Sequence, residues 1–332
     1  MPIDVHAHYV PRAILDVLHR GALDCGVSLT KTPACAECVH FEFGLTARPF
    51  FPRLIEKQDE RLKHMDKQGI SRQVLCLWAD IFGYALPSPK GTKWHRLLNE
   101  SLGSWCSANQ ERFAWLASGA LPDAASAARE LERAVREGGA AGGVVAANVS
   151  GVNLGELDLD EYWAAATSLD VPVFIHPTQP EPTSRTGRFA LNPIAQYTFD
   201  TTLAIGSLIS SGVLDRYPSM NLILSHGGGA FPYLAGRFDC LTSRMPATMT
   251  GHVAKKPPSA YLKSLYYDIV LHSSGSLRFL AESVGIERMV LGTDDGFPPA
   301  EHDPLGSLRA AGFGKPEIDT ISEANPRRIF RL

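Results

Sequence analysis

The sequence predicts a (β/α)8 TIM barrel, and three observations support that prediction. Short apolar, β-rich runs alternate with segments of helical spacing eight times along the 332 residues. The runs are almost continuously apolar, which is typical of parallel strands that are covered on both faces. A barrel of this kind needs roughly 250 residues. The chain is therefore long enough for one barrel with a small insertion after its first strand and helix.

The expected strands begin with IDVHAH and end with RMVLGTD. In chain order they cover residues 3–8, 72–79, 113–121, 142–149, 171–177, 221–228, 266–272 and 288–294. Between them, stretches such as AASAARELERAVREG carry apolar residues at helical spacing. Asp123, after a proline, and Ser274, before a glycine, are expected helix N-caps.

Residues 21–52 interrupt this alternation, and they are rich in Cys, Pro, Gly and Phe. We expect one domain over 1–332, with 21–52 as an insertion or lid over the barrel mouth. Two more irregular segments, 178–189 and 245–259, follow the fifth strand and precede the seventh. Loops that follow strands form the active-site face of a barrel. The segments 21–52 and 178–189 are therefore expected to shape a pocket.

The insertion also contains Cys35 and Cys38 in a CxxC pair, with Cys25 and His40 nearby. Together they could form a small zinc knot. One CxxC pair without a second pair is a poor zinc signature, however, so a flexible insertion is the favoured interpretation.

Charge and hydropathy exclude several classes of partner. The net charge is −3 without a long run of like charges, so neither nucleic acid nor an anionic membrane surface is expected as a partner. No apolar run approaches the roughly 20 residues of a membrane span. The first strand begins at Ile3, which leaves no room for a signal peptide, and the six cysteines are scattered. A reduced, cytoplasmic protein is the default expectation.

Four possible metal ligands lie at the carboxyl ends of expected strands. His6 and His8 are two positions apart, so they point to the same side of the first strand. His176 ends the fifth strand and Asp294 ends the eighth. In a barrel these ends meet at one rim. A single histidine in an apolar strand is often a core residue, but this combination predicts a site for zinc, manganese or iron(II).

His226, in ILSHGGGAF, ends the sixth strand at the same level. It is a candidate general acid/base or a second metal ligand. The alternative is a capping histidine before a flexible turn. Binuclear barrels commonly bridge their metals with a carboxylated lysine on the fourth strand, and GGVVAANV contains no lysine. A mononuclear site is therefore predicted.

Aromatic residues follow the second strand. Phe82 and Tyr84 are placed to contact an aromatic substrate, and Trp78 and Trp94 lie near them in the sequence. Packing in the core or under a lid is the commoner role of such residues, and both interpretations stay open.

The HxH, HP, SHGGG and GTD elements, in this order on alternating strands, resemble the amidohydrolase superfamily. The resemblance is closer to its metal-dependent decarboxylase branch, which includes the aminocarboxymuconate semialdehyde, γ-resorcylate, 5-carboxyvanillate and 6-methylsalicylate decarboxylases. It runs nearly end to end and is strongest over residues 199–239.

The resemblance implies a non-oxidative decarboxylase of an aromatic or conjugated unsaturated carboxylic acid. It implies metal ligands at His6, His8, His176 and Asp294, with His226 and Asp294 handling the proton. It places Arg48 where an arginine holds a substrate carboxylate. One divalent ion is expected, zinc in preference to manganese, without an organic cofactor. The expected partners are a small carboxylic acid and a second copy of the chain.

The chain departs from this resemblance in two places. Asp295 and Gly296 follow the last ligand where relatives commonly carry a different sequence, and Thr178 and Gln179 replace a Trp-Asp pair. Both departures leave the substrate open.

Other chemistries suit the same residues. A metal that activates water could hydrolyse an amide, a lactone or a C–C bond, or could hydrate an unsaturated acid. A catalytically silent barrel that only binds is a further possibility, although an intact ligand set argues against it.

Overall fold

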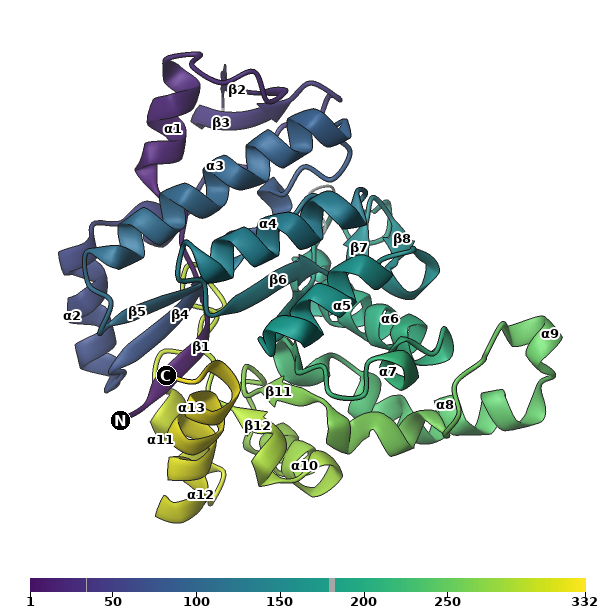
Figure 1. Ribbon diagram of the computed structural model, residues 1–332. Coiled ribbons are helices and arrows are strands. Elements are labelled where there is room, and N and C mark those ends of the chain that lie inside the picture. Colours follow the sequence, from purple (N-terminus) through teal and green to yellow (C-terminus); the bar gives the residue numbers. More distant parts are fainter. Residues whose placement is uncertain (34, 179–182) are drawn as a thin grey trace.

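The structure, a computed structural model, describes residues 1–33, 35–178 and 183–332 (Figure 1). Its centre is a parallel sheet of eight strands in the order β1-β4-β5-β6-β9-β10-β11-β12. These strands are β1 (Ile3–His8), β4 (Arg72–Cys76), β5 (Phe113–Ala117), β6 (Gly142–Ala146), β9 (Val173–His176), β10 (Leu222–Leu224), β11 (Tyr266–Asp268) and β12 (Met289–Val290). All eight expected strands are confirmed, although most are shorter than the apolar runs that predicted them.

The sheet closes because the segment after β12 pairs with β1. The Val5 amide donates to the Leu291 carbonyl at 2.9 Å, and the His8 amide donates to the Asp295 carbonyl at 2.7 Å. Ala7 and Asp295 form a parallel bridge. The predicted (β/α)8 barrel is therefore confirmed. Closure also brings the carboxyl end of β1 next to the segment that follows β12.

Helices surround the barrel on its outside (Figure 1). The main ones are α2 (Gln58–Gln68), α3 (Ser88–Ser107), α4 (Ala124–Arg136), α5 (Asp160–Leu169), α6 (Tyr197–Ser210), α8 (Phe231–Arg244) and α10 (Ser274–Val284). Shorter elements are α1 (Arg12–His19), β2 (Val27–Thr32), β3 (Cys35–Phe41), β7 (Asn148–Val149), β8 (Val152–Asn153), α7 (Val213–Arg216), α9 (Ala247–Thr250), α11 (Pro304–Ala310), α12 (Lys315–Asp319) and α13 (Asn325–Phe330).

The two predicted helix caps had different outcomes. The Asp123 carboxylate accepts the Ser126 amide at 2.9 Å, so the predicted cap of α4 is confirmed. The prediction for α10 was wrong by one residue, because Ser274 is already helical and Ser273 is the cap. Ser273 has the extended backbone that an N-cap requires, with φ −150° and ψ 127°.

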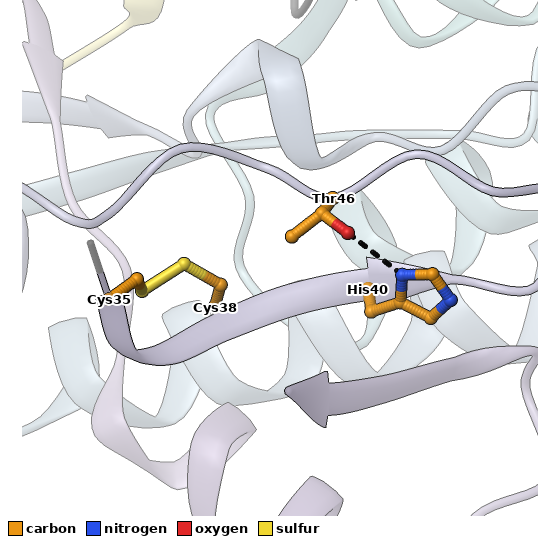
Figure 2. The surroundings of a disulfide bond; sticks show 4 residues. All are labelled: Cys35, Cys38, His40 and Thr46. Carbon is orange, nitrogen blue, oxygen red and sulfur yellow. Dashed lines mark hydrogen bonds between the residues drawn. A yellow bond between two sulfur atoms is a disulfide. The ribbon is translucent and has the colours of Figure 1, made fainter. Parts of the chain in front are cut away.

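The insertion contains two paired antiparallel strands, β2 and β3, which lie near α1 and α3 (Figure 1). Cys35 and Cys38 form a disulfide, and the His40 ring is hydrogen-bonded to the Thr46 hydroxyl (Figure 2), with 2.9 Å between Nδ1 and Oγ1. The zinc-knot alternative is therefore wrong, since both sulfurs are already bonded. The expected reduced state is also wrong for this pair.

The other two irregular segments are partly defined. Residues 179–182 lie outside the described part of the chain, so Gln179 and part of the segment 178–189 do too. Segment 245–259 contains α9 and projects from the barrel together with α8 (Figure 1). Among the helices that the structure describes, none combines the length and apolar character needed to cross a bilayer. The cytoplasmic location stays a prediction.

Candidate metal centre

Five predicted residues meet at the carboxyl ends of the strands. One ligand atom from each of His6, His176, His226 and Asp294 lies within 4.8 Å of the others. His8 joins this group, because its Nε2 is 3.0 Å from His6 Nε2 and 3.2 Å from Asp294 Oδ1. His6 Nε2 is also 3.2 Å from Asp294 Oδ1. The structure therefore brings together all the residues for which a metal or proton-handling role was predicted.

The backbone after the strands directs two of these side chains. His226, after β10, has φ 54°, and Asp294, after β12, has φ 56°. A left-handed backbone is uncommon outside glycine and is often found at functional sites. Gly229, three residues after His226, has φ 62°, and a Cβ there would lie 2.0 Å from the Thr198 carbonyl oxygen. The glycine run thus lets the His226 turn approach α6 closely.

Hydrogen bonds to the Nδ1 atoms orient the three histidines that were predicted as ligands. Asp268, on β11, places Oδ2 2.5 Å from His6 Nδ1, and its other oxygen accepts the Gly227 amide at 2.9 Å. His176 Nδ1 lies 2.8 Å from the Pro177 carbonyl oxygen, and His8 Nδ1 lies 3.4 Å from the Leu77 carbonyl oxygen. Each bond favours the tautomer whose Nε2 is free to bind a cation, as is usual for metal-ligating histidines.

The cluster combines buried carboxylates with imidazoles. Burial disfavours the His6 cation, but Asp294 and Asp268 outweigh it and raise the pKa of His6 to about 10. Burial, together with the nearby His8 and His6, holds the pKa of His176 well below its usual value. Burial opposes ionisation of Asp294 as well, yet the surrounding histidines hold its pKa well below the ordinary range. The ionised carboxylates of Asp294 and Asp268 therefore favour positive charge beside them, whereas His176 stays a neutral imidazole.

The side chains present fit a divalent metal ion. They offer imidazole nitrogens and a carboxylate oxygen, the donors that zinc and related ions prefer. His176 Nε2 is buried and has no hydrogen-bond partner among the residues that the structure describes. Such an unsatisfied nitrogen is costly unless something binds it. A cation within the cluster would satisfy it.

A cavity of about 780 Å³ opens beside the cluster. His176, His226 and Asp294 are part of its lining. Most of the remaining lining is apolar and includes Phe51, Trp78, Pro177, Ile194, Leu271 and Phe297. Large aromatic side chains of this kind suit a planar ring.

A polar wall of this cavity includes Arg48, for which substrate binding was predicted. Arg48 Nη2 donates to Asp80 Oδ2 at 3.0 Å and to the Tyr197 hydroxyl at 3.1 Å. Thr178 Oγ1 donates to Asp80 Oδ1 at 2.9 Å. Burial raises the pKa of Tyr197, so its hydroxyl stays neutral.

Phe82 and Tyr84, also predicted to bind substrate, lie elsewhere. Both are buried and line a neighbouring cavity of about 600 Å³. The linings of the two cavities share Asp80. Contact between these two aromatic residues and a ligand at the metal cluster stays a prediction.

Asp295 turns away from the metal cluster into a buried ionic network. Arg53 Nε donates to its Oδ1 at 3.1 Å, Arg61 Nη2 lies 3.3 Å from Oδ2, and Gln73 donates to Oδ2 at 3.2 Å. Gly296 has φ 124°, a backbone conformation that residues with a Cβ rarely adopt, and a Cβ there would lie 3.1 Å from His8 Cβ. The departure at these two positions thus packs the residue 48–56 loop against β1.

Three residues of the site were not predicted: Asp80, Tyr197 and Asp268. Asp268 had a sequence signal, since it is a carboxylate inside the apolar run YYDIVLH. Asp80 directly follows the second expected strand, where active-site residues of a barrel are usual. Tyr197 had no such signal, because it begins a helix.

Comparison with known proteins gives a consistent result. A family model described as Amidohydrolase matches residues 3–332. The chain is 27% identical over 307 residues to the 2-amino-3-carboxymuconate-6-semialdehyde decarboxylase of Dictyostelium discoideum, covering 92% of this chain and 84% of that one. It is 30% identical over 296 residues to the gamma-resorcylate decarboxylase of Polaromonas sp., covering 84% and 89% of the two chains.

Solved structures share the fold. The 5-carboxyvanillate decarboxylase of Sphingomonas paucimobilis matches with a TM-score of 0.80 and 23% identity, covering 100% of this chain and 99% of that one. A dihydroxybenzoic acid decarboxylase of Polaromonas sp. JS666, solved with manganese and the inhibitor 2-nitroresorcinol, also matches with a TM-score of 0.80, at 22% identity, covering 100% and 97%. Since the family model spans almost the whole sequence and the barrel is closed, this chain belongs to the amidohydrolase family.

Proposed function

We propose that this protein is a metal-dependent, non-oxidative decarboxylase of an aromatic or conjugated unsaturated carboxylic acid. The observation that carries the proposal is the cluster of histidines and Asp294 beside an aromatic-lined cavity. Relatives that match most of this chain support the same reaction, because they are named as decarboxylases of aromatic or conjugated acids.

We propose that His6, His8, His176 and Asp294 hold one divalent ion, without an organic cofactor. The donor set, rich in nitrogen, favours zinc, whereas manganese is bound in the structure of the Polaromonas enzyme. The ion, when bound, supplies positive charge that stabilises negative charge on a substrate oxygen next to the bond that breaks.

The protein's own residues handle the proton. Loss of carbon dioxide leaves the electron pair of the broken C–C bond on the ring carbon, and that carbon takes up one proton. His226 Nε2 lies 3.6 Å from Asp294 Oδ2. We assign the proton donor to this pair: Asp294 faces the cavity, and His226 exchanges the proton with it. Proton transfer by a positioned side chain is commonly worth 10²–10⁴ in rate.

Arg48 is the proposed contact for a polar group at the other end of the substrate. Its Nε is buried and has no hydrogen-bond partner among the described residues. The guanidinium carbon is 5.2 Å from the Trp78 ring centroid and 5.8 Å from that of Phe51. These contacts hold the guanidinium beside the apolar part of the cavity, where a substrate oxygen could accept from it. We also propose that Phe82 and Tyr84, which line the adjoining cavity, contact the substrate.

A metal-dependence assay tests this function. The purified protein would be stripped with a chelator and reloaded with zinc or manganese, and headspace carbon dioxide would be measured from a panel of hydroxybenzoates and muconate-type acids. We expect carbon dioxide release that depends on added metal. Products of ring opening or amide cleavage without carbon dioxide would instead indicate a hydrolase. Failure to bind stoichiometric metal would contradict both chemistries.

We also propose that the protein is a homodimer. Two helices that contact each other, α6 and α8, carry large exposed apolar side chains. Phe199 and Leu203 on α6 are 53% and 57% exposed, and Tyr233 on α8 is 78% exposed. Apolar patches of this kind on a folded protein commonly mark association sites.

A further inference from the structure

Arg48 does not present its full positive charge to the cavity. Its Nη2 donates to Asp80 at 3.0 Å, and the Asp80 side chain is only 3% exposed. Asp80 has a second donor in the Thr178 hydroxyl, at 2.9 Å from its other oxygen. The carboxylate is therefore a fixed part of the wall, buried next to the guanidinium that it neutralises.

Tyr197 completes this polar wall. Its hydroxyl accepts from Arg48 Nη2 at 3.1 Å and lies 3.4 Å from Asp80 Oδ2. The guanidinium is held at the same time against the Trp78 and Phe51 rings. Arg48, Asp80 and Tyr197 thus form a preorganised patch, which we name the Arg48–Asp80 patch, with donors and acceptors side by side.

The charged side chains in the cavity lining limit the charge that a ligand can carry there. Within the described residues, the lining contains the following titratable or charged side chains: Arg48, Asp80, His176, Tyr197, His226, His272 and Asp294. His176, His226 and Asp294 belong to the metal cluster. Away from that cluster, the formal charges of Arg48 and Asp80 cancel. The distal wall is therefore polar but close to neutral.

We infer that Asp80 is a specificity-determining residue that selects acids with a neutral hydroxyl at the Arg48–Asp80 patch against acids with a second carboxylate there. This inference rests on the proposed function. A hydroxyl can accept from Arg48 and donate to Asp80. A second carboxylate would place two negative groups against one guanidinium in a site of low dielectric, where like charges repel strongly. The resemblance noted above implied a carboxylate at Arg48, and the Asp80 pairing argues against it.

The test compares two probes that share a 2-hydroxybenzoate core. One is 2,5-dihydroxybenzoate, and the other is 4-hydroxyisophthalate, which carries a carboxylate in place of the 5-hydroxyl. Binding of each to the metal-loaded protein would be measured by titration calorimetry at pH 8. We expect wild type to prefer the dihydroxy acid by about tenfold, which equals about 1.4 kcal/mol. The Asp80→Asn variant should lose or invert this preference, chiefly by binding the dicarboxylate more tightly.

Three further variants keep the test decisive. Asp200→Asn removes a neighbouring carboxylate that contacts Thr178 and Asn148 but not Arg48, so it should keep the wild-type ratio. Arg48→Gln leaves Asp80 without its guanidinium, so the preference for the dihydroxy acid should increase. Asp80→Ser also removes the carboxylate and should lose that preference, so it decides the question if Asp80→Asn does not fold. An unchanged ratio in Asp80→Asn, no preference in wild type, or no binding of either probe would overturn the inference.

The two proposals fail separately. Absence of metal-dependent carbon dioxide release from every acid would contradict the proposed function whatever the binding ratio. An active decarboxylase whose probe ratio does not respond to Asp80→Asn would contradict the role of Asp80 alone.

Discussion

A single contact determines which nitrogen of the His6 ring is free to bind a cation. The ring has two nitrogens, and Asp268 lies 2.5 Å from Nδ1, which leaves Nε2 facing His8 and Asp294. Both residues of the His6–Asp268 pair are fully buried, so water does not compete for that bond. The same logic applies to His176, whose Nδ1 is occupied by a carbonyl oxygen. The arrangement of the His/Asp cluster therefore depends on residues that are not among the four proposed ligands.

The Asp268→Asn variant tests this dependence. The amide can no longer accept as a carboxylate does, so His6 should lose part of its orientation and basicity. We expect metal affinity to fall by about 10–100-fold, measured by competition with a chromophoric chelator. Ser276→Ala on α10, a partly exposed position, is a control that should retain wild-type affinity. Unchanged affinity in Asp268→Asn would contradict the role given to this carboxylate.

The His226→Asn variant tests proton handling. His226 is the proposed partner of Asp294 and is not among the four proposed ligands. We expect turnover to fall by about 10²–10⁴ while metal content stays near one ion per chain, measured by carbon dioxide release and elemental analysis. An active variant would refute the proton-handling role, and a metal-free variant would make His226 a ligand.

At the scale of elements, local capping follows sequence rules, whereas contacts between elements do not. Asp123 caps α4 as its sequence predicts, but the cap of α10 lies at Ser273 because the backbone of that residue is the extended one. Asp200, in the first turn of α6, instead accepts from Asn148 and Thr178, which follow two different strands of the barrel. This carboxylate ties α6 to the rim.

Asp123→Ala should destabilise α4. The substitution removes the bond to the Ser126 amide and the contact with Ser88, and loss of an N-cap typically costs about 1 kcal/mol. The measurement is the midpoint of urea unfolding. Ser274→Ala is the matched control and should change the midpoint little, because Ser273 caps that helix. Equal effects of the two substitutions would contradict the assignment of both caps.

Asp200 predicts a pH dependence of stability. Burial raises the pKa of Asp200 to about 6, although the bonds from Thr178 and Asn148 partly oppose the shift. The native state therefore holds this proton more tightly than the unfolded state, whose carboxyl has an ordinary pKa near 3.8. Its contribution to the free energy of unfolding is complete below about pH 4 and is lost as pH rises through about 6.

The Asp200→Asn variant should not show this loss of stability as pH rises. Between pH 4 and pH 7 its free energy of unfolding relative to wild type should rise by an amount on the order of 1 kcal/mol, and its relative melting temperature should rise with it. Thermal unfolding monitored by circular dichroism at several pH values checks the trend. A difference between the two proteins that does not vary with pH would contradict it.

At the scale of the whole molecule, barrel closure creates the site. His6 and Asp294 are almost 300 residues apart and meet because the segment after β12 pairs with β1. Closure also leaves α6 and α8 on the outside, where α8 projects from the body together with α9 (Figure 1). A second copy of the chain is the proposed cover for the exposed apolar residues of these helices.

Leu203→Asp tests this association. Leu203 is 57% exposed in the single chain, so a charge there would lie in the apolar face of α6 and should oppose dimer formation. The mass measured by sedimentation should fall from that of two chains toward that of one. Glu282→Asp on α10 is a conservative surface control. A wild-type protein that sediments as a monomer at micromolar concentration would contradict the dimer.

Much of the architecture and of the metal cluster could be predicted from the sequence alone. Continuous apolar runs identified the eight strands, and alternation within a strand placed His6 and His8 on the same side. Because parallel strands of a barrel end at one rim, residues at those ends must meet. These rules are local or topological, so they need no knowledge of side-chain packing.

The partners of those residues were decided by tertiary structure. Asp268 behind His6, Asp80 against Arg48 and Arg53 against Asp295 are each separated by tens to hundreds of residues. Which of them meet depends on strand register, loop path and the packing of neighbouring side chains, and no local pattern encodes these. The sequence by itself thus determined where a cation can bind, and only the folded chain decided which charges surround it.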